Sequence, residues 1–399
     1  MATSLKLILK SGKDDALRRY HPWVFSGAIK KTEGVARDGA IAHVYSNKNE
    51  YLGCGIYQDA TIAVRILAFA PEKHESFTAS FWSGRLQRAW NLRQAAGLTS
   101  HPLTNVYRLV HGEGDHLPGL IIDHYDGHLV IQIHATGLYG YLPDIAKALE
   151  TLYGSNLKSI YDKSRDTLPA DFVKEQGVGG FLHSESGRVQ VKEYGHIFEV
   201  DIAEGQKTGF FIDQRENRYL LGQYSQGRRV LNTFCYSGGF SVYALKAGAA
   251  CVHSLDSSAR AMDLTDRNVF LNDPGNTSHL SITSDAMQYL RETEQEYDLI
   301  ILDPPAYAKH AHVRHNAVQG YKRLNLEPLR LIRPGGLLFS FSCSQVVDLP
   351  LFRSTLMSAG ILAGRRLRIL HQLSQPADHP VNMFHPEGQY LKGLVLHVD

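Results

Sequence analysis

The sequence has no long apolar run and few cysteines. No stretch approaches the ~20 consecutive apolar residues of a membrane-spanning helix, so we expect no membrane segment. The apolar stretch at residues 5–9 contains Lys6 and is too short for a signal peptide, so we expect a cytoplasmic protein. The 4 cysteines lack any Cys-x-x-Cys spacing, which argues against a zinc site or a disulfide framework. We therefore expect no bound metal.

The chain also lacks a strong net charge and the composition of a disordered protein. Its formal net charge is +2 over 399 residues, and 43% of the residues are hydrophobic. This composition excludes disordered and collagenous proteins, and the length is roughly two to three times that of one domain. Residues 1–70 nevertheless carry ten Lys and Arg against six Asp and Glu. This basic segment is either an ordinary solvated face or a surface for an acidic partner.

The first part of the chain predicts a small β-barrel domain over residues 1–72. Short strands separated by turns are expected at residues 5–10, 40–45, 51–57 and 62–69. Between the first two strands, Arg18 and Arg19 lie next to aromatic residues, a combination that suits contact with phosphates and bases. For Trp23 and Phe25 we favour packing inside the barrel.

The next part predicts a small α+β middle domain over residues 73–190. Helical spacing of apolar residues at 81–92 and 145–153 indicates two helices. Strands are expected at residues 107–110, 119–125 and 128–134, the last two joined by the hairpin signal Asp126-Gly127. A further hairpin at 189–194 and 197–202 leads out of this domain.

Residues 191–399 predict an α/β domain with a mostly parallel sheet, because strands alternate with helices from about Arg229. The expected strands are residues 229–234, 251–256, 279–283, 297–302 and 336–341, followed by 366–373 and 390–398. No convincing helix separates the last two, so an antiparallel pair at the sheet edge would fit. This arrangement resembles the seven-stranded, Rossmann-like sheet of the class I methyltransferase fold.

The turn after the first strand of this sheet is a candidate cofactor loop. Gly238 lets a ligand approach the backbone of this loop closely, beside Phe234, Tyr236 and Ser237. The spacing is not Gly-x-Gly-x-x-Gly, so the fingerprint of a dinucleotide-binding protein is missing. A nicotinamide-dependent oxidoreductase is therefore disfavoured.

Three aspartates stand at or just after the ends of successive strands of the same sheet. Asp256 is placed to accept hydrogen bonds from ribose hydroxyls, and Asp285 could meet an adenine amino group. Asp303 is held at a strand tip by the two prolines that follow it, although it could instead cap the next helix. Together with the Gly-rich turn, these residues indicate a cofactor that contains a nucleoside.

At this point the chain resembles a known family over essentially its whole length. The motifs that carry the resemblance are His21-Pro22-Trp23-Val24-Phe25-Ser26-Gly27, Lys207-Thr208-Gly209-Phe210-Phe211-Ile212-Asp213-Gln214-Arg215, Asp303-Pro304-Pro305, Phe341-Ser342-Cys343-Ser344, Ala377-Asp378-His379-Pro380 and Pro386-Glu387-Gly388-Gln389-Tyr390-Leu391-Lys392. They are similar to those of the bacterial and archaeal S-adenosylmethionine-dependent 23S rRNA 5-methylcytosine methyltransferases.

The resemblance implies an order of domains, a cofactor and a partner. It implies an N-terminal PUA domain that binds RNA, a small α/β domain and a C-terminal catalytic domain. The implied cofactor is S-adenosyl-L-methionine, with Gln214 and Arg215 close to it; the alternative for Arg215 is a surface ion pair. The implied partner is 23S rRNA or a precursor of the large ribosomal subunit. A homodimer is compatible with the sequence.

The expected reaction gives Cys343 the role of nucleophile. Carbon 5 of a pyrimidine becomes reactive only after a thiolate adds at carbon 6. Cys343 follows the strand next to the one that ends in Asp303, and Asp303 would hydrogen-bond the amino and ring-nitrogen edge of the cytosine. The alternative for Cys343 is a buried small hydrophobe. Cys235 is the rival thiol, expected to face the methyl donor.

Several alternatives stay open on the sequence. Ala306 stands where some 5-methylcytosine enzymes carry a second cysteine, so a single-cysteine mechanism and a 5-methyluridine product are also considered. A tRNA substrate and a non-catalytic RNA-binding assembly factor are further alternatives. The segment 309–315 offers three histidines, but we interpret it as a cationic loop for RNA phosphates. Tyr321, Lys322 and Asn325 could close over the target base or belong to a helix surface. The base that removes the carbon 5 proton is not identified.

Overall fold

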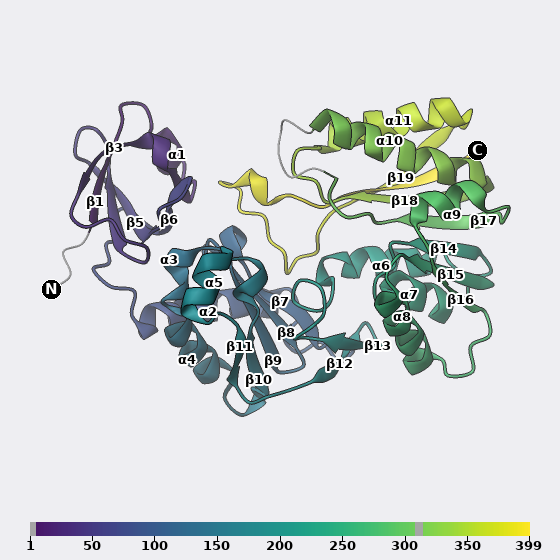
Figure 1. Cartoon of the computed structure of the whole chain (residues 1–399), viewed down its shortest axis with the longest axis horizontal. Coiled ribbons are helices and arrows are strands. Elements are labelled where there is room, and N and C mark those ends of the chain that lie inside the picture. Colours follow the sequence, from purple (N-terminus) through teal and green to yellow (C-terminus); the bar gives the residue numbers. More distant parts are fainter. Residues whose placement is uncertain (1–4, 308–313) are drawn as a thin grey trace. The chain divides into compact units, whose positions relative to one another are not determined.

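The computed structural model describes residues 5–307 and 314–399, and it divides into two compact units (Figure 1). Unit 1 comprises the chain up to Val191 together with Val200–Ile212 and Ala377–Gly388. Unit 2 comprises Lys192–Glu199, Asp213–Pro376 and Gln389–Asp399. The expected domain boundaries at residues 72 and 190 stay a prediction.

The N-terminal part of unit 1 is a six-stranded sheet in the order β2-β6-β5-β4-β1-β3. Its elements are β1 (Leu5–Leu9), α1 (Asp15–Arg18), β2 (Trp23–Phe25), β3 (Ile29–Glu33), β4 (Ile41–Tyr45), β5 (Tyr51–Tyr57) and β6 (Ile62–Phe69). The four predicted strands are confirmed. The strands β2 and β3 were missed because β2 has only 3 residues and the middle of β3 is polar and exposed.

Two aromatic residues of this sheet lie where the sequence did not predict. Phe25 is 45% exposed, and Trp23 is half-buried and donates a hydrogen bond from Nε1 to Oε1 of Glu113 at 2.8 Å. The core of the sheet is instead aliphatic, with Leu5 and Leu7 fully buried. The prediction that Trp23 and Phe25 fill the barrel was therefore wrong.

The rest of unit 1 is built on a five-stranded sheet in the order β11-β10-β9-β8-β7. Its elements are α2 (Ala79–Ala95), β7 (Val106–His111), β8 (Leu120–Tyr125), β9 (His128–Ile133), α3 (Thr136–Tyr139), α4 (Leu142–Tyr153), β10 (Ser159–Asp162), α5 (Ala170–Gln176) and β11 (Gly180–His183). The predicted helices α2 and α4 are confirmed, and so are strands β7 to β9. Buried residues of both helices, such as Trp82 and Ile145, pack against the sheet. The predicted hairpin forms the two-stranded sheet of β12 (Arg188–Glu193) and β13 (His196–Asp201).

Unit 2 contains the predicted seven-stranded sheet, in the order β16-β15-β14-β17-β18-β20-β19. Its elements are α6 (Arg215–Gln223), β14 (Arg229–Thr233), α7 (Gly239–Lys246), β15 (Cys251–Asp256), α8 (Ala259–Asn272), β16 (His279–Thr283), α9 (Ala286–Glu292), β17 (Tyr297–Leu302), α10 (Arg314–Leu331), β18 (Ile332–Ser342), α11 (Leu349–Ala363), β19 (Leu367–Leu373) and β20 (Lys392–Val398). The strands β14 to β18 are parallel, and β20 pairs antiparallel with both β18 and β19. The prediction of an antiparallel pair at the edge is confirmed.

Helices cover both faces of this sheet (Figure 1). Successive residues of β17 point to opposite faces, so Ile300 and Leu302 pack with α9, α10 and α11, whereas Leu299 and Ile301 pack with α6 and α7. Burial on both faces explains the continuous apolar run of this strand. Within the described residues, no helix is both long and apolar enough to cross a membrane. The carboxyl ends of the parallel strands meet at one sheet edge, where such folds bind ligands.

Candidate functional site

The loop between β14 and α7 has a strained backbone and lies at the carboxyl ends of the parallel strands. Phe234 and Tyr236 have φ of 55° and 47°, and Gly238 has φ of 73°. Residues other than glycine rarely adopt a positive φ. The backbone strain that a positive φ causes persists only where the surrounding structure enforces it. At Gly238 an added Cβ would lie 2.7 Å from Cγ2 of Thr265, so only glycine fits. Thr265 therefore explains the need for glycine at this position, and the approach of a cofactor to this loop stays a prediction.

Asp256 holds this loop in place from the end of β15. One carboxylate oxygen accepts a hydrogen bond from the backbone nitrogen of Tyr236. The other accepts one from the backbone nitrogen of Ser258, and both distances are 3.0 Å. A carboxylate has about four lone-pair sites, so two remain for ribose hydroxyls. The buried Ser237 is held through its carbonyl by Nδ2 of Asn268 at 2.8 Å.

Asp285 has a structural role that uses one of its two carboxylate oxygens. It is the N-cap of α9, and its Oδ1 accepts a hydrogen bond from the backbone nitrogen of Gln288 at 2.9 Å. The residue is exposed. The contact with an adenine amino group stays a prediction, and it would have to use the oxygen that does not cap the helix.

The structure brings Gln214 and Asp303 together, although they are far apart in the sequence. Nε2 of Gln214 donates a hydrogen bond to Oδ2 of Asp303 at 3.0 Å, and Nδ2 of Asn217 donates to Oε1 of Gln214 at 2.6 Å. The bond from Asn217 fixes the amide so that its nitrogen faces the carboxylate. Asp303 is half-buried, directly after β17, and Gln214 is 3% exposed. Asp303 is thus oriented by a side chain that is itself held in place.

Arg215, the first residue of α6, is fully buried rather than on the surface. Its Nε lies 3.3 Å from Oε1 of Glu216, whose side chain is largely exposed. The alternative of a surface ion pair is therefore wrong, because the guanidinium of Arg215 is buried. A role for Arg215 near the cofactor stays a prediction.

Cys343 lies beside the segment that follows Asp303. It comes directly after β18, and its Sγ is 4.0 Å from the carbonyl oxygen of Pro304. The residue is partly exposed, so the thiol is not sealed in a packed core. Cys343 and Asp303 therefore follow neighbouring parallel strands and stand at the same sheet edge.

The other three cysteines are placed differently. Cys235 is buried, and its Sγ lies 3.6 Å from Sδ of Met262 in α8. Burial raises the pKa of its thiol to about 12, so it stays protonated at neutral pH. Cys251 begins β15, at the opposite end of a parallel strand, and Cys54 is buried in unit 1. Of the four thiols, Cys343 alone combines partial exposure with a place at the carboxyl edge.

A buried lysine that the sequence did not single out stands next to Cys343. Lys392 begins β20 opposite Ser342, is 5% exposed, and donates from Nζ to the carbonyl oxygens of Ser344 and Tyr390 at 2.6 and 2.7 Å. Burial lowers the pKa of Lys392 to about 8, while the charges of Cys343 and Asp348 act in the opposite direction. Its ammonium is thus electrostatically coupled to the Cys343 thiol. The only sequence signal was its place in the closing motif.

Tyr321 and Asn325 support the end of β18 from inside α10. Both are buried, the hydroxyl of Tyr321 lies 3.1 Å from Oγ of Ser344, and Oγ of Ser340 donates to Oδ1 of Asn325 at 2.6 Å. Because both side chains are buried, neither belongs to an exposed helix surface. Neither is an exposed side chain that could close over a target base. Residues 309–313, most of the predicted cationic loop 309–315, lie outside the described residues.

Comparison with known proteins assigns the chain to a family. The family described as S-adenosylmethionine-dependent methyltransferase matches residues 107–381, and a PUA-like domain matches residues 7–69. The chain belongs to this methyltransferase family, and its cofactor is S-adenosylmethionine. The predicted class, fold and cofactor are confirmed, and the oxidoreductase alternative is excluded.

Relatives of similar length carry a more specific name. The chain is 36% identical to the ribosomal RNA large subunit methyltransferase I of Shewanella amazonensis, covering 99% of this chain and 100% of the relative. It is 37% identical to the protein of the same name from Aeromonas hydrophila, covering 98% and 99%.

Among solved structures, a methyltransferase complexed with SAH superimposes with a TM-score of 0.84 at 23% identity, covering 98% of this chain and 99% of that one. A SAM-dependent methyltransferase from Streptococcus mutans gives a TM-score of 0.83, also at 23% identity and with the same coverage. These two matches support the fold.

Proposed function

We propose that the chain transfers a methyl group from S-adenosylmethionine to carbon 5 of a cytosine in 23S rRNA, through a covalent adduct with Cys343. The relatives that share its full length are named as methyltransferases of large-subunit ribosomal RNA. The observation that carries the mechanism is the position of the partly exposed Cys343 thiol, 4.0 Å from the carbonyl oxygen of Pro304 and beside Asp303.

The residues that would hold the cofactor are those of the β14–α7 loop and the tip of β15. The carboxylate of Asp256, at the tip of β15 and bonded to the backbone of Tyr236 and Ser258, supports a site for a nucleoside with ribose hydroxyls. When bound, S-adenosylmethionine supplies an electrophilic methyl group on a sulfonium. The part of this chain is to hold that group and to make carbon 5 nucleophilic.

In the proposed reaction the Cys343 thiolate adds to carbon 6 of the cytosine. The sulfur–carbon bond forms while the electrons of the carbon 5–carbon 6 double bond move to carbon 5. Carbon 5 would then bond to the methyl group, and the electron pair of the broken sulfur–methyl bond would stay on the donor sulfur, leaving S-adenosylhomocysteine. Asp303, oriented by Gln214, accepts a hydrogen bond from the exocyclic amino group and holds the base in place. Loss of the proton from carbon 5 restores the double bond and expels the thiolate. The base that takes this proton is not assigned.

We assign Lys392 a positioning and electrostatic role in this reaction. A thiolate is the reactive form of cysteine, and a nearby cation lowers the pKa of a thiol. The Lys392 ammonium is anchored on the carbonyl oxygen of Ser344, the residue after Cys343. Its charge therefore favours the thiolate at the point where the reaction needs it.

The partner is proposed to be 23S rRNA or a precursor of the large ribosomal subunit, in the cytoplasm. A target base in structured RNA must leave its stack, and RNA contacts outside the catalytic unit offset that cost. The PUA-like domain supplies a basic segment and exposed rings such as Phe25 for such contacts. The reaction as written needs no metal ion. A homodimer stays a prediction.

Methylation of ribosomal RNA tests this proposal. The full chain is incubated with methyl-labelled S-adenosylmethionine and with 23S rRNA, 16S rRNA or tRNA that lacks modifications, and each RNA is digested to nucleosides. Label in 5-methylcytidine from 23S rRNA alone supports the proposal. Label in 5-methyluridine or in tRNA favours the corresponding alternative, and absence of label together with RNA binding favours an assembly factor.

A further inference from the structure

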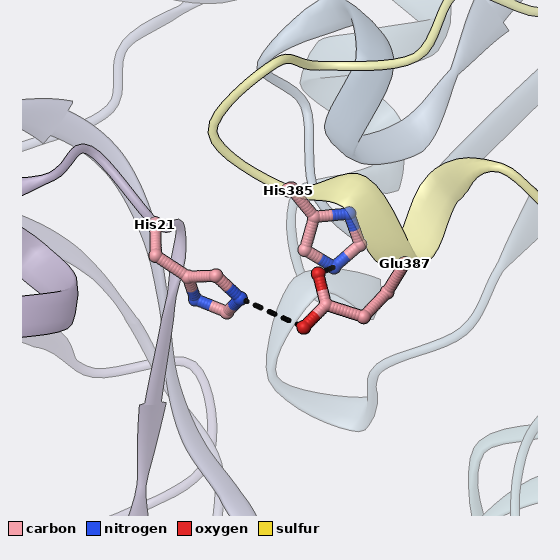
Figure 2. A group of neighbouring side chains, drawn as sticks. All are labelled: His21, His385 and Glu387. Atoms are coloured by element: carbon pink, nitrogen blue, oxygen red, sulfur yellow. Dashed lines mark ion pairs between the residues drawn. The ribbon is translucent and has the colours of Figure 1, made fainter.

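Three potential metal ligands from opposite ends of the sequence converge in unit 1 (Figure 2). His21 lies just before β2, whereas His385 and Glu387 belong to the segment Ala377–Gly388. Nε2 of His21 lies 3.5 Å from Oε1 of Glu387, and Nε2 of His385 lies 3.8 Å from Oε2 of the same carboxylate. One ligand atom from each of the three residues lies within 4.8 Å of the others. Figure 2 shows both imidazoles directed at the carboxylate.

The buried side chain of His385 lacks hydrogen-bond partners within the part of the chain that the structure describes. It is 3% exposed, and neither of its ring nitrogens has a hydrogen-bond partner among the described residues. Leaving a buried polar group unsatisfied costs about 1–3 kcal/mol, and native proteins rarely tolerate it without an ion or water. The Nε2 atom that lacks a partner is the one that faces Glu387.

The charges around this imidazole suit a bound cation. The carboxylates of Glu113 and Glu387 both act electrostatically on the His385 ring. Glu113 is held close by Trp23, whose Nε1 donates to its Oε1 at 2.8 Å. Two carboxylates therefore face this place and would balance the charge of a divalent ion.

We propose that His21, His385 and Glu387 bind one divalent transition-metal ion, of which zinc is the best fit. Ligand atoms at ~2.1 Å from a tetrahedral zinc ion lie about 3.4 Å apart. The two imidazole nitrogens lie 3.5 and 3.8 Å from the two oxygens of Glu387, and one ligand atom of each residue lies within 4.8 Å of the others, so small side-chain movements reach this spacing. Two imidazoles with one carboxylate suit zinc, whereas magnesium and calcium take oxygen ligands. Glu387 has a side chain that is 52% exposed, so the ion can enter from solvent.

The bound ion would join the segment Ala377–Gly388 to the start of β2 within unit 1. This role is structural and is independent of the proposed methyl transfer. It replaces the expectation of no bound metal, which rested on sequence spacing alone and could not see ligands brought together from both ends of the chain.

Cobalt binding to the full-length protein tests the site. His310 and His312 in the segment 308–313 could bind metal by themselves, so the parent protein for this test carries H310N and H312N. After treatment with a chelator, the parent is titrated with Co²⁺ and the visible absorption of tetrahedral Co²⁺ is recorded. Zn²⁺ is then added as a competitor, and the melting temperature is measured with and without Zn²⁺. We expect one Co²⁺ per chain, displaced by Zn²⁺, and a higher melting temperature with Zn²⁺.

Matched variants separate this site from unspecific binding. His385→Phe keeps a ring in the buried position and Glu387→Gln keeps the shape of the side chain, yet each removes one ligand. Each should weaken Zn²⁺ binding by at least about 10-fold, since even loss of an outer partner of a ligand costs that much. His183→Gln is the control, because His183 faces Glu150 at 3.6 Å but belongs to no three-ligand cluster among the described residues.

The outcomes are decisive in either direction. Loss of the cobalt spectrum in both variants but not in the control supports the site. A parent that binds no ion, or variants that bind as tightly as the parent, overturns it. Circular dichroism reports whether each variant folds, and His21→Gln replaces His385→Phe if that variant unfolds.

Discussion

Replacing Lys392 with Met is expected to change how stability depends on pH. Lys392 is 5% exposed, and burial lowers its pKa from 10.5 to about 8. Between these two values the unfolded chain holds a proton that the folded chain has lost. Unfolding then takes up a proton, so the free energy of unfolding rises with pH in this window. Methionine is of similar length and cannot titrate, so the variant should lack this rise.

The size of the effect follows from the two pKa values. At pH 7 the lysine is charged in both states, and burying that charge lowers the free energy of unfolding by about 3 kcal/mol. At pH 9.5 the folded state holds mostly neutral lysine, and about 2 kcal/mol of this loss is recovered. The variant also loses the hydrogen bonds to Ser344 and Tyr390. That loss is nearly the same at both pH values and cancels when they are compared.

Urea unfolding of the native protein and of Lys392→Met at pH 7 and pH 9.5 measures this difference. Lys246→Met is the control, because the Lys246 ammonium also donates to a backbone carbonyl, that of Asn272 at 3.2 Å, but is exposed. The difference between native protein and Lys392→Met should change by about 2 kcal/mol between the two pH values, and the control should change little. If the free energy of unfolding changed by the same amount between pH 7 and pH 9.5 in all three proteins, the lowered pKa of a buried Lys392 ammonium would be refuted.

The same variant tests the proposed effect of Lys392 on Cys343. An opposite charge nearby typically lowers a pKa by about 1–3 units. The pH at which kcat/KM reaches half of its maximum should therefore rise by at least about 1 unit in Lys392→Met. A purely structural role would lower the rate at every pH without moving the profile.

Three further variants test the cofactor loop and the sheet edge. Cys343→Ala should abolish methyl transfer while calorimetry still detects S-adenosylmethionine binding; product formed by this variant would remove the thiol from the mechanism. Gly238→Ala places a Cβ 2.7 Å from Cγ2 of Thr265 in a left-handed conformation that costs a further ~1–2 kcal/mol, so S-adenosylmethionine should bind at least about 10-fold more weakly. Unchanged affinity would show that the loop does not hold the cofactor. Gln214→Ala removes the hydrogen bond to Asp303, worth about 1.5–3 kcal/mol, so kcat/KM should fall roughly 10- to 100-fold; a normal rate would contradict the positioning role.

The fold of unit 2 could be predicted because each strand has a strong local signal. The run from Leu299 to Leu302 is apolar on both faces, and successive residues pack in different cores. The short strand β2 and the polar strand β3 have no such signal, because their pairing partners rather than their side chains define them. Strand pattern thus predicted the large sheet and left the edges of the small one undetermined.

The candidate site could be predicted only in part. Turn and strand-end rules singled out Asp256, Asp303 and Cys343 because Asp256 ends a strand and the other two directly follow strands. The hydrogen bond from Gln214 to Asp303 and the ammonium of Lys392 beside Ser344 join residues that are distant in the sequence. Such contacts depend on tertiary packing, which residue spacing does not encode.

Covalent trapping of RNA tests the central claim most directly. The full chain is incubated with S-adenosylmethionine and 23S rRNA that contains 5-fluorocytidine, whose fluorine cannot leave as a proton does. The native protein should yield a protein–RNA complex that survives denaturing electrophoresis, with the RNA attached to Cys343 in a peptide digest, and Cys343→Ser should yield none. A stable complex in Cys343→Ser, or methylated RNA from the native protein with no trapped complex, would contradict the account.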